Sequence, residues 1–408
     1  MPRYRQAVEA GCTVISARSK DRPTEDNSVK HSYKSALPII VALFLIGFSD
    51  ATLKAASSWE EQWNRTVEAA KKEGQLNTYG LADITHPAIL EAFNKRYPEI
   101  KVVTVIGHTE VIERIVAERR AGKYVADVFS SGPAILRQAY SAKFMQPIRP
   151  ILMLSDVTDT TKWYGGKHLW SDPEEKYLLL FEGTPASASI AYNTNKLPNL
   201  DEIQSYWDVL KPKWKGNIGF FNDGQGAAVP TPIVALYYNP QVGPNFLKKL
   251  FEEMDLTLSR DRRQATDWLG RGRYTLCFLC RGIEEAQKIG LPVETIHGNQ
   301  IKEAGELGTG NSSVLGFFDK APHPNAAIVF INWFLSREGQ MTWQKVLNTI
   351  VVNGSDSMRI DIPKDDVLPG YRRAEGRQYL MLGFVDPKPV GKYYWQLIEK
   401  AGREKSKQ

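Results

Sequence analysis

The sequence has few of the residue types from which catalytic metal centres and disulfide scaffolds are built. It holds 3 Cys and 6 His in 408 residues, and the histidines are scattered along the chain. The motifs G-x-S-x-G and H-E-x-x-H and the Walker phosphate loop do not occur. The net charge is +6, yet no run of Lys and Arg is interleaved with aromatic residues. A nucleic-acid-binding surface is therefore not expected.

The chain contains one long uncharged apolar run, residues 36–48 (ALPIIVALFLIGF). It is too short for an ordinary membrane span. Two lysines precede it and small residues follow it, which is the pattern of a cleaved secretory signal peptide. An uncleaved membrane anchor is the alternative. We expect translation to start at Val29 and the mature protein to begin between Thr52 and Ser58, in the periplasm.

Two of the three cysteines form a C-x-x-C motif in the segment TLCFLC. In a secreted protein this motif suggests a redox pair. The segment also has the pattern of a buried strand, in which residues three apart point to opposite faces. A disulfide would need a local bend, so we predict that Cys277 and Cys280 are buried free thiols.

Helices and strands alternate in the first part of the chain. Apolar spacing predicts helices over residues 58–75, 87–97 and 110–120, and valine-rich strands over 101–106 and 126–129. This alternation is typical of a parallel sheet covered by helices on both faces.

A nearly uninterrupted apolar stretch, residues 326–335, predicts a deeply buried helix. Asn325 is the predicted N-cap of this helix. Ser336 is predicted to begin a second helix, with Glu338 at its positive end and Gly339 as an unfavourable helical residue.

Two separated stretches closely resemble one family. They are APHPNAA followed by INWFLSREGQ in residues 321–340, and VIERIVAERRAGKYVADVFSSG in residues 111–132. Both resemble the extracellular solute-binding proteins of bacterial ABC importers, in the group that includes the ferric-ion binders. LSRDRRQATDWLGRGRYTLCF and VVNGSDSMRIDIP resemble other parts of that family, and the resemblance covers about residues 59–365.

The resemblance implies an α/β fold with two lobes and two hinge crossovers, the type II periplasmic binding protein fold. Residues 1–57 are then the pre-sequence and signal peptide. Lobe 1 is expected in residues 58–187 and 307–365, and lobe 2 in residues 188–306. Residues 366–408 are expected to form a C-terminal helical tail.

Ligands of open α/β sheets bind beyond the carboxyl ends of strands, where helix N-termini offer N–H groups. Four loops stand at such places, and each taken alone is more often a helix cap than a site. The resemblance implies that the family's cleft is built from them. We therefore expect the ligand to be bound by Asp83, Thr109, Ser130, Ser131, Gly132, Asp223, Gly226, Ala227 and Arg260.

Arg260 is the expected charged partner of the ligand. Its guanidinium could hold a carboxylate or phosphate through two hydrogen bonds. The alternative is a solvated arginine of the run RDRR, paired with Asp261.

The resemblance implies the periplasmic substrate-binding component of an ABC importer, which captures a small solute by hinge closure. The helix N-termini and Arg260 predict that this solute is an organic anion. The expected partners are that ligand and the ABC permease and ATPase at the inner membrane, and the protein is expected to be a monomer. The family's ferric-ion members carry two adjacent tyrosines where this chain has Cys277 and Phe278, which counts against iron. A ferric-binding protein and a secreted enzyme are the alternatives. We expect no enzymatic activity, no cofactor, no metal and no nucleic-acid partner.

Overall fold

The computed structural model describes residues 59–405, except 108, 186–187, 223–228, 304, 306–312, 352–353, 375, 378 and 380–384. The predicted signal peptide and the expected start of the mature chain lie outside the described residues. None of the described helices has both the length and the apolar character needed to cross a membrane.

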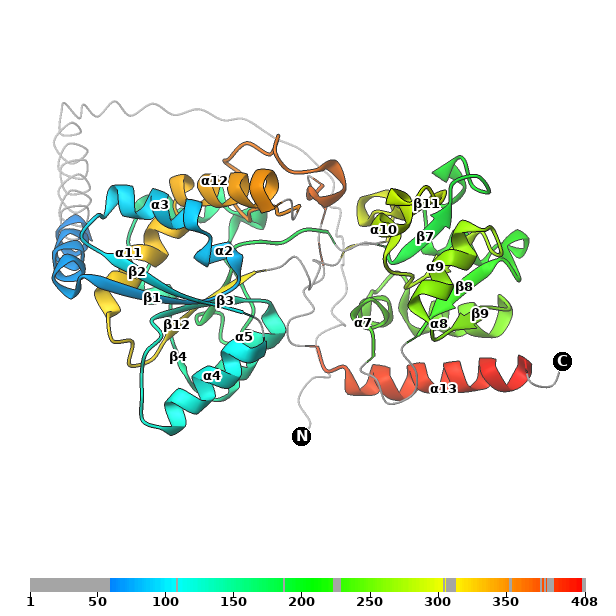
Figure 1. The fold of residues 1–408 in the computed structure, drawn as a ribbon, viewed down its shortest axis with the longest axis horizontal. Coiled ribbons are helices and arrows are strands. Elements are labelled where there is room, and N and C mark those ends of the chain that lie inside the picture. Colours follow the sequence, from blue (N-terminus) through cyan, green and yellow to red (C-terminus); the bar gives the residue numbers. More distant parts are fainter. Residues whose placement is uncertain are drawn as a thin grey trace, which may run out of the picture. The chain divides into compact units, whose positions relative to one another are not determined.

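Two separate β-sheets organise the described part of the chain (Figure 1). The first sheet has the strand order β2-β1-β3-β12-β6-β5, and β4 pairs with β12 outside this path. The second has the order β11-β7-β10-β8-β9. We call the first sheet with its helices lobe 1 and the second sheet with its helices lobe 2. Each lobe has a large hydrophobic core of its own.

Lobe 1 takes its strands from both halves of the sequence. They are β1 (Gln75–Gly80), β2 (Lys101–Ile106), β3 (Val128–Ser131), β4 (Met145–Gln146), β5 (Leu169–Trp170), β6 (Leu178–Leu180) and β12 (Val314–Phe318). Its helices are residues 59–73, α2 (Ala82–Thr85), α3 (Pro87–Arg96), α4 (Thr109–Arg120), α5 (Pro133–Ser141), α6 (Ser155–Thr158), α11 (Pro324–Leu335) and α12 (Arg337–Val346).

Lobe 2 is built mainly from the middle of the chain. Its strands are β7 (Ile190–Asn193), β8 (Ile218–Phe221), β9 (Thr257–Ser259), β10 (Leu276–Phe278) and β11 (Val293–Ile296). Its helices are α7 (Thr231–Tyr238), α8 (Gly243–Glu253), α9 (Arg262–Gly270), α10 (Ile283–Lys288) and α13 (Lys388–Lys405).

Both sheets mix parallel and antiparallel pairs. The predicted parallel pairing is confirmed for β1 with β2 and with β3, and β8 is parallel to β9 and β10. By contrast, β12 runs antiparallel to β3 and β6, and β7 antiparallel to β10 and β11. In lobe 1 the carboxyl ends of β1, β3 and β6 therefore share one edge with the first residues of β12.

The buried helix pair α11 and α12 confirms one predicted cap and contradicts another. The Ser336 side chain accepts a hydrogen bond from the Gly339 amide and begins α12. Any side chain at Gly339 would collide with the Trp333 carbonyl, because the two helices turn so tightly. Asn325 is not the N-cap, since α11 starts at Pro324. Instead the distant Glu73 carboxylate accepts the amides of Asn325 and Ala326.

The C-terminal helix α13 belongs to the core of lobe 2, where it packs against α7 and α8. The side chains of Val390, Tyr394 and Leu397 recur on one face of the helix and are buried in that core. The expected C-terminal tail therefore contains a helix that supplies part of a lobe.

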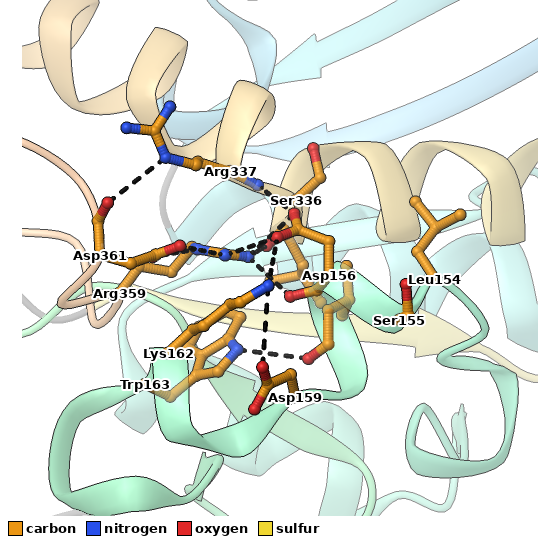
Figure 2. A network of polar contacts seen from close by, with 12 residues as sticks. Leu154, Ser155, Asp156, Asp159, Lys162, Trp163, Ser336, Arg337, Arg359 and Asp361 are labelled. Carbon is orange, nitrogen blue, oxygen red and sulfur yellow. Dashed lines mark hydrogen bonds and ion pairs between the residues drawn. The ribbon is translucent and has the colours of Figure 1, made fainter.

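A fully buried arginine joins the segment after α12 to the rest of lobe 1. The Arg359 guanidinium donates to the carboxylates of Asp156 and Asp361 and to the main-chain carbonyls of Asp156 and Leu335 (Figure 2). It also lies 5.6 Å from the centroid of the Trp163 ring. A buried guanidinium is stabilised only when its donors are satisfied in this way.

We predict that Arg359→Met lowers the free energy of unfolding by about 3 kcal/mol. It removes the charge that Asp156 and Asp361 share and leaves two main-chain carbonyls without this donor, although Asp156 keeps Lys162 and the Arg337 amide. Arg337→Met is the matched control. Arg337 is exposed in the same network and its side chain donates to the Asp361 carbonyl, so its loss should cost less than ~1 kcal/mol. Urea unfolding of both variants measures the difference, and equal losses would contradict the assigned role of Arg359.

Candidate functional site

A polar cluster lies at the edge of lobe 1 where β1, β3 and β6 end and β12 begins. Asp83 follows β1 at the start of α2, Ser130 and Ser131 end β3, and Glu182 follows β6. Ser313 precedes β12, and its carbonyl accepts the amides of Phe181 and Glu182. The sheet register thus brings together residues that are far apart in the sequence.

Asp83 and Ser130 are directly bonded. The Ser130 hydroxyl donates to the Asp83 carboxylate over 2.6 Å, and the Ile84 amide donates to the other carboxylate oxygen over 2.9 Å. Burial raises the pKa of Asp83, while the hydroxyls of Ser130 and Ser313 offset part of that rise. The predicted pair Asp83 and Ser130 therefore forms one hydrogen-bonded unit.

Glu182 is the most perturbed carboxyl group of this cluster. Its side chain is buried, and burial raises its pKa from 4.5 to about 7. The nearby carboxyl groups of Asp83 and Asp356 raise it further, whereas the hydroxyls of Ser355 and Ser313 lower it. Its Oε1 atom has no hydrogen-bond partner within the described residues. A buried acid of this kind exchanges a proton near neutral pH.

A charged centre lies beside this cluster, in the segment that follows α12. The buried Asp356 carboxylate pairs with Lys364 over 2.7 Å and with Arg373 over 3.3 Å. Burial lowers the pKa of Lys364 to about 8, against the opposing charge of Asp356. Arg373 also donates to the Gly183 carbonyl, next to Glu182. Both cations are therefore already engaged by Asp356 and main-chain groups.

The structure brings together four of the predicted site residues: Asp83, Ser130, Ser131 and the partly exposed Gly132, which precedes α5. Asp223, Gly226 and Ala227 lie outside the described residues, as does the side chain of Thr109. Arg260 follows β9 in lobe 2 and is exposed.

The edge of lobe 2 has a pocket of about 410 Å³ at the end of β10. Its lining includes Cys280, Arg281, Glu284 and Glu285 together with the start of β7. Because β8, β9 and β10 are parallel, Asn222, Arg260 and Arg281 follow their carboxyl ends at one edge of this sheet. This edge therefore combines two exposed arginines with amide and carboxylate groups.

The prediction of free thiols is wrong. Cys277 and Cys280 form a disulfide. The required bend is supplied at Leu279, whose φ of 60° lies in the left-handed region. Cys280 and Arg281 both line the pocket of lobe 2. The disulfide therefore fixes the turn that precedes Arg281.

Sequence reasoning missed Glu182, Ser313 and Asp356. Glu182 lies in a stretch of small residues that resembles a connection, and Asp356 lies in the family-like tail NGSDSMRIDIP. A lone acidic residue directly after an apolar strand could have identified Glu182 as a strand-end group. Among the described residues, no group of three or more His, Cys, Asp or Glu side chains could hold a metal ion.

We predict that Glu182→Gln stabilises the unliganded protein above pH 7. The folded state keeps the Glu182 proton up to about pH 7, whereas the unfolded chain releases it near pH 4.5. Stability therefore falls as the pH rises between these values, by about 3 kcal/mol in total, and the amide removes that loss. Urea unfolding at pH 5 and pH 8 measures the effect. The exposed control Glu91→Gln should behave as the wild type, and identical pH dependence in all three proteins would contradict the buried acid.

Comparisons with known proteins agree with this architecture. The profile of the family described as bacterial extracellular solute-binding protein matches residues 80–341. A comparison with curated protein sequences gives no significant match.

Several solved structures share the fold, which is that of type II periplasmic binding proteins. One is the Trichodesmium protein IdiA (FutA) in complex with iron and citrate, with 19% identity, a TM-score of 0.53 and coverage of 81% of this chain and 99% of that chain. Another is ferric iron-binding protein A of Mannheimia haemolytica in an open conformation, with 14% identity, a TM-score of 0.54 and coverage of 81% and 98%. An ABC transporter structure from Clostridium perfringens has 14% identity, a TM-score of 0.53 and coverage of 80% and 99%.

The profile covers well over half of the sequence, and the two-sheet architecture and the strand-end polar clusters fit the same assignment. The chain therefore belongs to the bacterial extracellular solute-binding protein family.

Proposed function

We propose that this protein is the periplasmic component of an ABC importer that captures a small organic anion between its lobes and delivers it to the permease. The proposal rests on one observation: in both lobes, polar residues lie at the carboxyl ends of the strands. Lobe 1 offers Ser130, Ser131 and the start of α5, and lobe 2 offers Arg260 and Arg281. Strand ends of this kind are the usual ligand positions of open α/β sheets.

Closure of the lobes is the proposed mechanism. A ligand that contacts both lobes only in the closed form stabilises that form by its extra contacts. The closed form would then be the one that the permease and ATPase recognise, with the protein acting as a monomer and without enzymatic turnover.

Ligand-dependent compaction tests this mechanism. Mass spectrometry of small molecules released from the purified protein should identify the solute. We expect that solute to reduce the radius of gyration in solution scattering and to raise the melting temperature by mass action. An unchanged radius at saturation, or conversion of the solute to a product, would favour the alternative of a rigid secreted enzyme.

We predict that Arg260→Ala weakens binding of the anionic solute by roughly 2–5 kcal/mol, the cost of removing one partner from a desolvated charged pair. The exposed position of Arg260 at the end of β9 leaves its guanidinium accessible. Arg263→Ala, in the first turn of α9, is the matched control and should change the affinity little. Calorimetry distinguishes the outcomes, and equal small losses would place Arg260 on a solvated surface.

A ferric-binding function is the alternative within the family, since two of the similar structures are of iron-binding proteins by their descriptions. The position of the expected tyrosine pair holds Cys277, which is in a disulfide, and Phe278, and neither supplies the oxygen ligand that Fe(III) prefers. Saturable binding of one Fe(III) per chain would favour iron over an organic anion.

A further inference from the structure

Two buried carboxyl groups at the edge of lobe 1 have no counter-cation among the described residues. Asp83 is 4% exposed and Glu182 is 2% exposed. Within the described residues, no Lys, Arg or His forms an ion pair with either of them, whereas the neighbouring Asp356 has both Lys364 and Arg373. Isolated buried carboxylates are costly unless a positive charge or a proton neutralises them.

The hydrogen bonds around Asp83 and Glu182 are also incomplete. Asp83 is satisfied by Ser130 and the Ile84 amide, but Glu182 Oε1 and the hydroxyls of Ser131 and Ser355 have no partner within the described residues. Ser131 is fully buried and lies in register with Val314, which also pairs with Leu180 at the end of β6. Native proteins rarely leave buried polar atoms unpaired, so these atoms indicate the place of a ligand group.

The geometry points to a subsite in lobe 1 for a protonated amine of the solute, with Glu182 and Asp83 as its counter-charges and Ser131 as a further acceptor. An ammonium group offers three donors and no acceptor, which matches these acceptor atoms. This inference rests on the proposed solute-binding function. Combined with the arginines of lobe 2, it identifies the solute as zwitterionic, with an anionic group toward Arg260 and Arg281 and an amine toward Glu182.

A metal ion fits this subsite less well than an amine. Among the described residues no cluster of three metal-ligating side chains exists, and a bare divalent or trivalent ion needs more ligands than two carboxyl groups provide.

Glu182 also lies in the connection between β6 of lobe 1 and β7 of lobe 2. The proposed lobe movement would therefore act on the place where the amine binds.

The charges around Glu182 determine how amine binding depends on pH. Asp83 faces it from the start of α2, Ser313 from the start of β12, and Ser355 and Asp356 from the segment after α12. The positive charges of Lys364 and Arg373 are paired with Asp356. Binding of an ammonium ion requires ionised Glu182. The dissociation constant should thus fall about fivefold as the pH rises from 6 to 7 and about tenfold from pH 6 to 8, where it levels off.

Matched compounds test the inference directly. Thermal shifts would be recorded at pH 8 with α- and ω-amino acids, with the carboxylic acids that lack the amine, with diamines, with neutral sugars, and with Mg²⁺, Ca²⁺ and Fe(III). We expect stabilisation by at least one amino acid and a much smaller shift with its amine-free counterpart. Equal shifts for the two, shifts with metals or sugars alone, or no shift with any amine would overturn the inference.

Calorimetry of the best amino acid with Glu182→Gln gives a second readout. We expect at least about 30-fold weaker binding and no pH dependence between pH 6 and 8. The same variant should be more stable than the wild type without ligand, which shows that it is folded. Glu91→Gln, exposed on α3, should keep wild-type affinity. Unchanged affinity in Glu182→Gln would overturn the amine subsite.

The two proposals fail in different ways. If a carboxylate or sugar binds the wild type and Glu182→Gln equally, the amine subsite is wrong and the solute-binding function stands. If no solute binds in any class and none is released from the purified protein, both are wrong.

Discussion

The buried charge of Arg359 is the interaction on which the arrangement of lobe 1 depends. Its guanidinium satisfies groups from α6, from the end of α11 and from its own segment. Arg359 and Asp156 are separated by 203 residues in sequence. A fully satisfied buried ion specifies one arrangement, because any shift would leave a charge without a partner.

The position of the candidate site follows from this anchor. The segment that carries Arg359 forms short antiparallel bridges at Trp163 and at Glu182, and the Met358 amide donates to the Phe181 carbonyl. Arg359 therefore holds Ser357 and Asp356 against the strand end that carries Glu182. Two buried charge systems of different character result. Asp356 is neutralised by Lys364 and Arg373, whereas Asp83 and Glu182 form no ion pair with the described residues.

A buried carboxyl group without a counter-charge has a known cost in stability. A carboxyl group kept where its charge is unfavourable lowers the stability of the empty protein, and the ligand restores what is lost. The same group gives discrimination, because an analogue without the matching cation leaves the acid uncompensated. Stability and affinity thus oppose each other at Glu182, as they commonly do at binding sites.

Much of the fold could be predicted from the sequence, because apolar spacing and caps are local signals. The turn at Ser336 was foreseen, as were the strand ends at Asp83 and Ser130. The cap of α11 was missed because Glu73 supplies it from more than 250 residues away. The disulfide was missed because one residue, Leu279, adopts a left-handed conformation that strand periodicity does not reveal. Glu182 was missed because its raised pKa comes first from burial and then from the charge of Asp356, against the hydroxyls of Ser355 and Ser313. Only the folded chain brings these groups together.

Helix α13 affects how the two lobes are divided along the sequence. Its buried face completes the core of lobe 2, although the core residues between Val314 and Met358, which precede it, belong to lobe 1. Each lobe is therefore encoded by two separated segments that interleave along the gene. A fragment that spans β7 to β11 would lack one wall of its core. To produce lobe 2 alone, an engineer would have to join the end of β11 to α13 through a new linker.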